Sequence, residues 1–67
     1  MNDTAVKAAV AKFLKNINGT AQREIEKVVR SAIASGKLQP HESCTAGVTL
    51  TAEKIGLNIT IYSKIEI

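Results

Sequence analysis

Alternation of apolar and polar side chains along the C-terminal third of the chain constrains the fold more than any other feature. It occurs in two runs, residues 46–52 and 57–67, separated by the short break 53–56. Because successive side chains of a strand point to opposite faces, this period of two predicts an antiparallel hairpin with one buried face. If Ala52 faces Leu57 across the break, every inward residue of the first run meets an inward residue of the second. The expected pairs are Ala52 with Leu57, Leu50 with Ile59, and Val48 with Ile61.

Two segments before the hairpin have helical periodicity. In the first, apolar residues recur every three or four positions and fall on one stripe. This stripe comprises Val6, Ala9, Val10, Phe13, Leu14 and Ile17. We expect Asp3 or Thr4 to cap the start of this helix, and Asn18-Gly19 to end it, because both residues tolerate left-handed backbone angles.

The second helix is expected to begin at Thr20, a good N-cap, and to end at Gly36. Pro40 prevents the helix from resuming. Its apolar stripe comprises Ala21, Ile25, Val28, Val29, Ala32 and Ile33.

The sequence therefore predicts a single α+β domain, residues 1–67, with two helices packed on one face of an antiparallel β-hairpin. A short third strand at residues 37–39 is left open, because Lys37-Leu38-Gln39 is too brief for a pattern. The expected core comprises Val10, Phe13, Ile17, Ile25, Val28, Val29, Ile33, Val48, Leu50, Ile59 and Ile61.

A chain of 67 residues buries only about 60% of the surface that its unfolded form exposes. It has one cysteine, hence no internal disulfide, and no paired Cys or His spacing typical of structural zinc. Stability must come from packing or self-association. Lys7, Lys12 and Lys15 interrupt the apolar residues near the N-terminus, so we expect neither a signal peptide nor a membrane span, and a cytosolic protein.

The C-terminal strand, residues 57–67, is expected to form an exposed sheet edge. It is apolar on one face and carries few charges that would block pairing with another chain. We therefore expect a self-association interface at Leu57, Ile59, Ile61 and Ile65. The alternative is a monomer, with the edge covered by residues 37–39 or frayed.

The net charge of +3 lies entirely in residues 1–36, the predicted helical half, which contains six basic and three acidic residues. Arg23, Lys27 and Arg30 are spaced by four and three, opposite the apolar stripe, and we call them the basic row. Such a row can contact phosphates. It can equally be a solvated face, since Glu26 and Glu24 stand at ion-pair spacing from Arg30 and Lys27.

Helix, turn, helix and hairpin is also the order of a winged helix-turn-helix fragment. Nucleic-acid binding through the basic row is accordingly the alternative function. The fit is poor, because Leu14 stands where close helix crossing needs a small residue and no third helix exists. Phe13 is expected in the core and Tyr62 is the one remaining ring, so there is no platform for base stacking.

The loop at residues 40–45 holds the one histidine, His41, and the one cysteine, Cys44. Neighbouring residues of one short loop rarely converge on a metal or a substrate, and no third orienting group is identifiable. No phosphate-binding glycine loop occurs, and a chain this small has little room for a closed cleft. We expect no enzyme activity, no metal and no cofactor.

Four segments resemble a family of small uncharacterised bacterial proteins of similar length: residues 12–15, 20–27, 35–38 and 49–51. The resemblance covers most of the chain and implies a compact bacterial cytosolic domain with the order helix, helix, strand, strand. It implies no activity and no site. Asn18-Gly19 and the loop with His41 and Cys44 depart from the family pattern.

Together these features predict a small interaction protein that acts through its surface. Its partner is another protein or a second copy of itself, with nucleic acid as the alternative.

Overall fold

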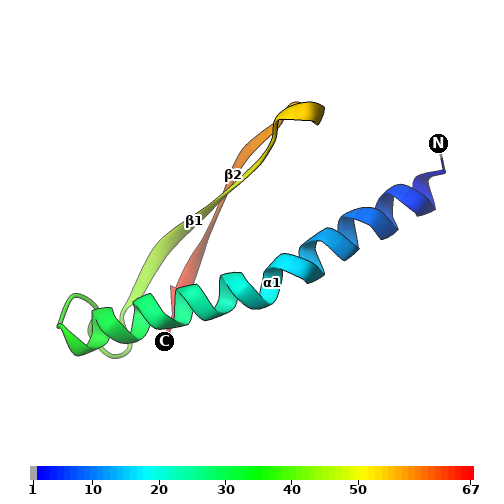
Figure 1. The fold of residues 1–67 in the computed structure, drawn as a ribbon. Coiled ribbons are helices and arrows are strands. Elements are labelled where there is room, and N and C mark those ends of the chain that lie inside the picture. Colours follow the sequence, from blue (N-terminus) through cyan, green and yellow to red (C-terminus); the bar gives the residue numbers. More distant parts are fainter. Residues whose placement is uncertain (1) are drawn as a thin grey trace.

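The structure is a computed structural model and describes residues 2–67. Helix α1 spans Asp3–Ala34, strand β1 spans Ser43–Ala52, the short 3₁₀ helix η1 spans Glu53–Ile55, and strand β2 spans Leu57–Glu66. Figure 1 shows one long helix and one long hairpin that diverge from a common base near the C-terminus. The α+β class is confirmed, with an antiparallel hairpin as its sheet.

The prediction of two helices is wrong, because α1 continues through Asn18, Gly19 and Thr20 without a turn. Glycine in a helix costs only about 1 kcal/mol relative to alanine, and it keeps the backbone N–H that proline would remove. The apolar spacing also stays in phase across this point, since Ile17, Ala21 and Ile25 follow each other at intervals of four. A continuous helix therefore keeps one apolar face along its whole length.

The ends of α1 lie close to their expected positions. Asn2, one residue before the expected caps, is the N-cap, and its Oδ1 accepts a hydrogen bond from the backbone N–H of Thr4 at 2.8 Å. At the other end Gly36 has a φ of 82°, which favours glycine. The chain then reverses, and the N–H of Leu38 donates to the carbonyl of Ala32 at 3.2 Å. The open alternative of a strand at residues 37–39 is wrong, since this segment is a loop.

The hairpin has the predicted register. Ala52 pairs with Leu57, Leu50 with Ile59, and Val48 with Ile61. The tight connection is η1, which ends at Gly56 with a φ of 71°. Strand β1 is longer than expected, because it begins at Ser43 and thus includes Cys44, whereas β2 begins at Leu57 as expected and ends one residue early. The alternation of side chains, together with the glycine in the turn, was sufficient to fix this element.

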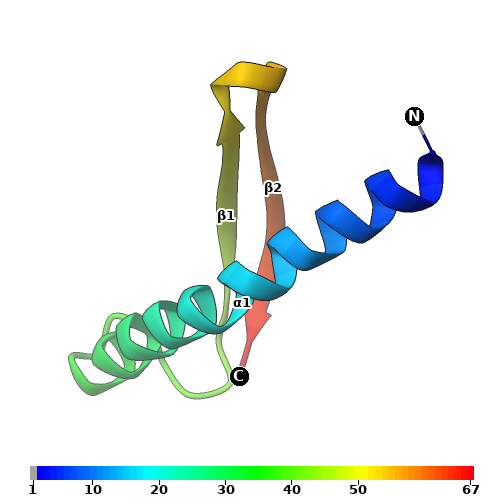
Figure 2. The same ribbon diagram turned by 45° about the vertical axis from the view of Figure 1, so that its right-hand side comes forward.

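Helix and hairpin contact each other only at their shared base. The molecule measures 50 × 20 × 17 Å and its radius of gyration is 15.7 Å, whereas a compact domain of this length has about 11 Å. Within the described residues only Leu38 is buried, and Phe13, for example, is 50% exposed. The predicted core is therefore not assembled within one chain, as the open arrangement in Figure 2 also shows.

Candidate interaction surface

The space between α1 and the hairpin forms an apolar groove of about 830 Å³. Val48 and Leu50 of β1 and Ile61 of β2 form one wall. The wall contributed by α1 comprises Leu14, Lys15, Ile17, Asn18, Ala21, Gln22, Ile25 and Glu26. The groove thus joins the apolar stripe of the helix to the apolar face of the hairpin, the two surfaces that were expected to pack on each other.

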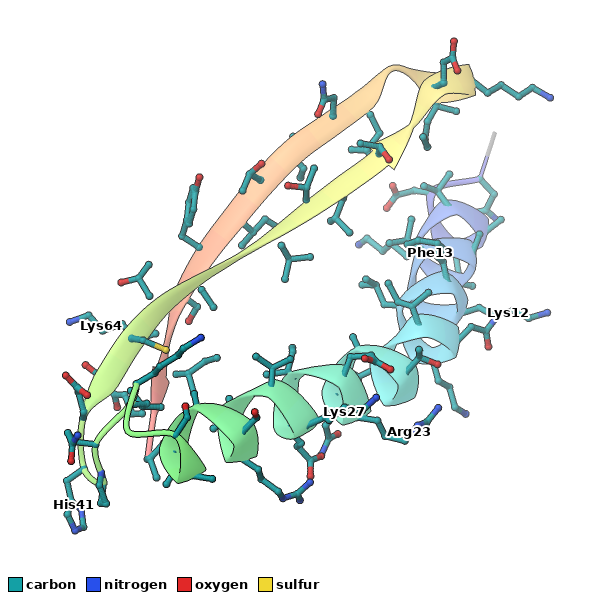
Figure 3. The ribbon with its side chains drawn as sticks, turned by 60° about the vertical axis from the view of Figure 1, so that its left-hand side comes forward. Lys12, Phe13, Arg23, Lys27, His41 and Lys64 are labelled. Atoms are coloured by element: carbon teal, nitrogen blue, oxygen red, sulfur yellow. The ribbon has the colours of Figure 1, made fainter. Side chains whose placement is uncertain are left out.

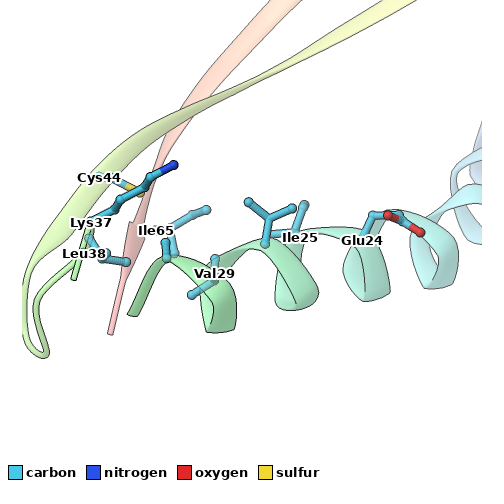
Figure 4. Close-up of a pocket in the computed structure, with 9 residues that line it drawn as sticks. Glu24, Ile25, Val29, Lys37, Leu38, Cys44 and Ile65 are labelled. Carbon is cyan, nitrogen blue, oxygen red and sulfur yellow. The ribbon is translucent and has the colours of Figure 1, made fainter. Parts of the chain in front are cut away.

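A second hollow of about 510 Å³ lies where helix and hairpin meet. Figure 4 shows Val29 of α1 beside Ile65 of β2, with Ile25 further along the helix and Leu38 on the other side of Ile65. Ile25 lines both hollows, so they adjoin. We call the two together the inner groove.

The apolar side chains around the inner groove are half exposed. Ile25 is 43%, Leu14 47% and Ile61 53% accessible to solvent. The accessible surface of the chain is 5942 Å², whereas a compact monomer of 7.2 kDa exposes about 4,100 Å². Roughly 1,800 Å² of surface is therefore in excess of what a compact monomer of this mass exposes. Contiguous apolar surface of this kind marks a surface that binds a protein, a membrane or a ligand.

The predicted edge-strand residues lie on β2 with their side chains on a single face. Ile61 and Ile65 line the inner groove, Ile59 is 47% exposed, and Leu57 is half-buried. The sheet has two strands, so the outer backbone edge of β2 has no neighbouring strand within residues 2–67. The structure therefore brings Ile61 and Ile65 together with α1, while pairing of the backbone edge with another chain stays a prediction.

The basic row is exposed, and Figure 3 shows Arg23 and Lys27 on the side of α1 away from the hairpin. Arg30 donates to Glu26 at 2.9 Å, and Lys27 lies 4.0 Å from Glu24. The Arg23 guanidinium donates to the Thr20 hydroxyl at 3.2 Å. A winged-helix arrangement of this row is wrong, because α1 contains no turn. Binding of phosphates by the row stays a prediction.

The two residues singled out in the loop are separated in the structure. His41 has a φ of 70° in the turn before β1 and points away at the far end of the molecule (Figure 3). Cys44 lies on β1 opposite Ile65 and is exposed. In the part of the chain that the structure describes, no three His, Cys, Asp or Glu residues are grouped as a metal site would require.

Comparison with known proteins decides the family. The whole chain, residues 1–67, matches a family described as "Family of unknown function (DUF6494)". The chain belongs to this family. The resemblance to a family without an established activity is thereby confirmed. No curated protein and no solved structure matches the chain. Across residues 2–67, no helix is long and apolar enough to cross a membrane.

The exposure of apolar residues on the first half of α1 was not predicted from the sequence of this DUF6494 chain. Val10 and Phe13 were assigned to a closed core, yet both are about half exposed. The sequence did contain one indication that these residues would be exposed. A sheet of two strands offers too little surface to cover an apolar stripe that runs through six turns or more of helix.

Proposed function

We propose that the protein is a self-associating interaction module whose inner groove is covered by a second copy of the chain. The observation that carries this proposal is the exposure of both apolar faces in the same chain. Val10 on the helix and Ile61 on the hairpin are each 53% accessible. Neither the apolar face of α1 nor that of the hairpin is covered by the rest of its own chain. For the fold to be stable, another surface must therefore pack against both faces.

The area of the exposed surface fits a second copy. Obligate homodimers bury on the order of 2,000 to 5,000 Å² in total, or roughly half of that per chain. The excess of roughly 1,800 Å² per chain falls in this range. A two-fold dimer also needs a self-complementary surface, and a chain with one apolar helix face and one apolar sheet face provides that.

The chemistry of the inner groove supports an apolar partner. The inward positions of both strands, from Cys44 to Ala52 and from Leu57 to Ile65, carry no charged side chain. A nucleic acid presents phosphates and would leave this surface uncovered. The basic row is on the other side of α1 and two of its three members already have acidic neighbours. The proposal assigns no catalytic role to the chain.

Urea unfolding at two chain concentrations tests the proposal, with the helical circular dichroism signal as the readout. If folding depends on association, mass action makes the midpoint rise with concentration. A 100-fold increase in concentration should stabilise the folded state by about 2.7 kcal/mol of dimer. A midpoint independent of concentration over that range would contradict the proposal.

A further inference from the structure

The N-terminal part of α1 has the geometry of an exchanged segment. We define the N-terminal arm as residues 3–13, the part of α1 that precedes Leu14, the first residue lining the inner groove. It extends beyond the base where helix and hairpin meet and stays apart from the hairpin of its own chain (Figures 1 and 2). Its apolar side chains nevertheless lie on the side that faces the hairpin. Figure 3 shows Phe13 on that side of the helix and Lys12 directed away.

We propose that two copies exchange their N-terminal arms, so that the arm of each lies in the inner groove of the other. This inference rests on the proposed self-association and specifies the surface that it uses. Phe13, Val10 and Val6 of one copy would then cover the apolar face of the partner's hairpin.

The dimensions of the two parts agree with this exchange. The arm is 11 residues of helix, or about 16 Å long. The apolar face of the hairpin between Val48 and Ala52 is about 14 Å long. One arm is therefore long enough to cover this stretch of the apolar face. Reciprocal placement also buries both arms, which a single closed chain with a straight α1 does not achieve.

The position of Asn18-Gly19 explains why an exchange is favoured over closure within one chain. Asn18 and Gly19 tolerate left-handed backbone angles, so the chain can either turn at this point or continue as a helix, as a hinge would. With a turn, the arm would fold back on its own hairpin. With the continuous helix that the structure shows, the arm is carried away from its own hairpin and becomes available to another copy. Exchange of an identical element is a common route to dimers.

Isotope-filtered NOE spectroscopy on a mixture of ¹³C-labelled and unlabelled full-length chains tests the proposal. Phe13 is the sole phenylalanine, so its ring protons are unambiguous. We expect cross-peaks from the ring of an unlabelled copy to the methyl groups of Val48, Leu50, Ile59 and Ile61 of a labelled copy. A dimer whose intermolecular contacts join β2 to β2 would overturn the exchange and leave self-association intact. A monomer with contacts only within one chain would overturn both.

A matched pair of variants gives a second readout. Phe13→Ala should raise the dimer Kd by roughly 100-fold or more, because large-to-small changes at apolar contacts cost several kcal/mol. Lys12→Ala changes the neighbouring residue on the opposite side and should alter the Kd by less than about threefold. Equal effects of the two substitutions, or no effect of Phe13→Ala, would overturn the exchange.

Discussion

Gly19 is the residue on which the form of the helix depends. It lies in the interior of α1, where glycine is about 1 kcal/mol less favourable than alanine. A Cβ at this position would approach only the Arg23 guanidinium, at 3.4 Å, which is ordinary contact. The position therefore accepts a side chain without strain.

Gly19→Ala is accordingly expected to stabilise the protein by about 0.5 to 1 kcal/mol per chain, measured by urea unfolding at fixed chain concentration. Gly36→Ala is the control, because Gly36 has a φ of 82° and alanine there should destabilise. A destabilised Gly19→Ala variant would indicate that a turn at Asn18-Gly19 is formed in solution.

Tyr62 covers Gly47 on the polar face of the hairpin. A Cβ at Gly47 would lie 2.8 Å from the Tyr62 ring, so the ring occupies the space that a side chain would take. Cross-strand packing of this kind contributes roughly 0.2 to 1 kcal/mol. Tyr62→Ala should therefore increase amide hydrogen exchange of the neighbouring pair Thr49 and Thr60, whereas Tyr62→Phe, which keeps the ring, should not. Equal exchange in both variants would show that the ring contributes nothing to the hairpin.

At the scale of elements, the hairpin was predictable from the sequence and the helix was not. The register of β1 and β2 follows from local alternation and from the turn at Gly56, so few other pairings compete with it. The break at Asn18-Gly19 was a local signal for a turn, but the stripe that continues through Ile17, Ala21 and Ile25 favours one helix. Local propensity is a weak guide where a longer pattern opposes it.

The outer side of α1 yields a prediction about nucleic acids. Because Glu24 and Glu26 stand beside Lys27 and Arg30, we expect the basic row to be a solvated face. Fluorescence anisotropy with a labelled DNA duplex should show no tight binding at about 0.15 M salt. The triple variant Arg23→Ala, Lys27→Ala, Arg30→Ala should behave like the parent. Tight binding that weakens steeply with salt and is lost in the triple variant would instead establish the row as a phosphate contact.

At the scale of the whole molecule, the sequence predicted which residues are apolar and inward, but not how many chains supply the core. Phe13 and Ile61 both belong to the expected core, and both are about half exposed in the single chain. Periodicity assigns a side chain to a face of an element, and the same face can be covered by its own chain or by another. The candidate surface could thus be listed from the sequence, while its openness required the structure.

The mass of the protein in solution is the most direct test of the proposal that two chains together form the core. Sedimentation equilibrium of the full chain at several concentrations should give a species of twice the chain mass of 7.2 kDa. We expect this dimer to persist at micromolar concentration, since an interface of about this area is typical of obligate pairs. A folded chain that stays at 7.2 kDa at every concentration would contradict the proposal that a second copy completes the core.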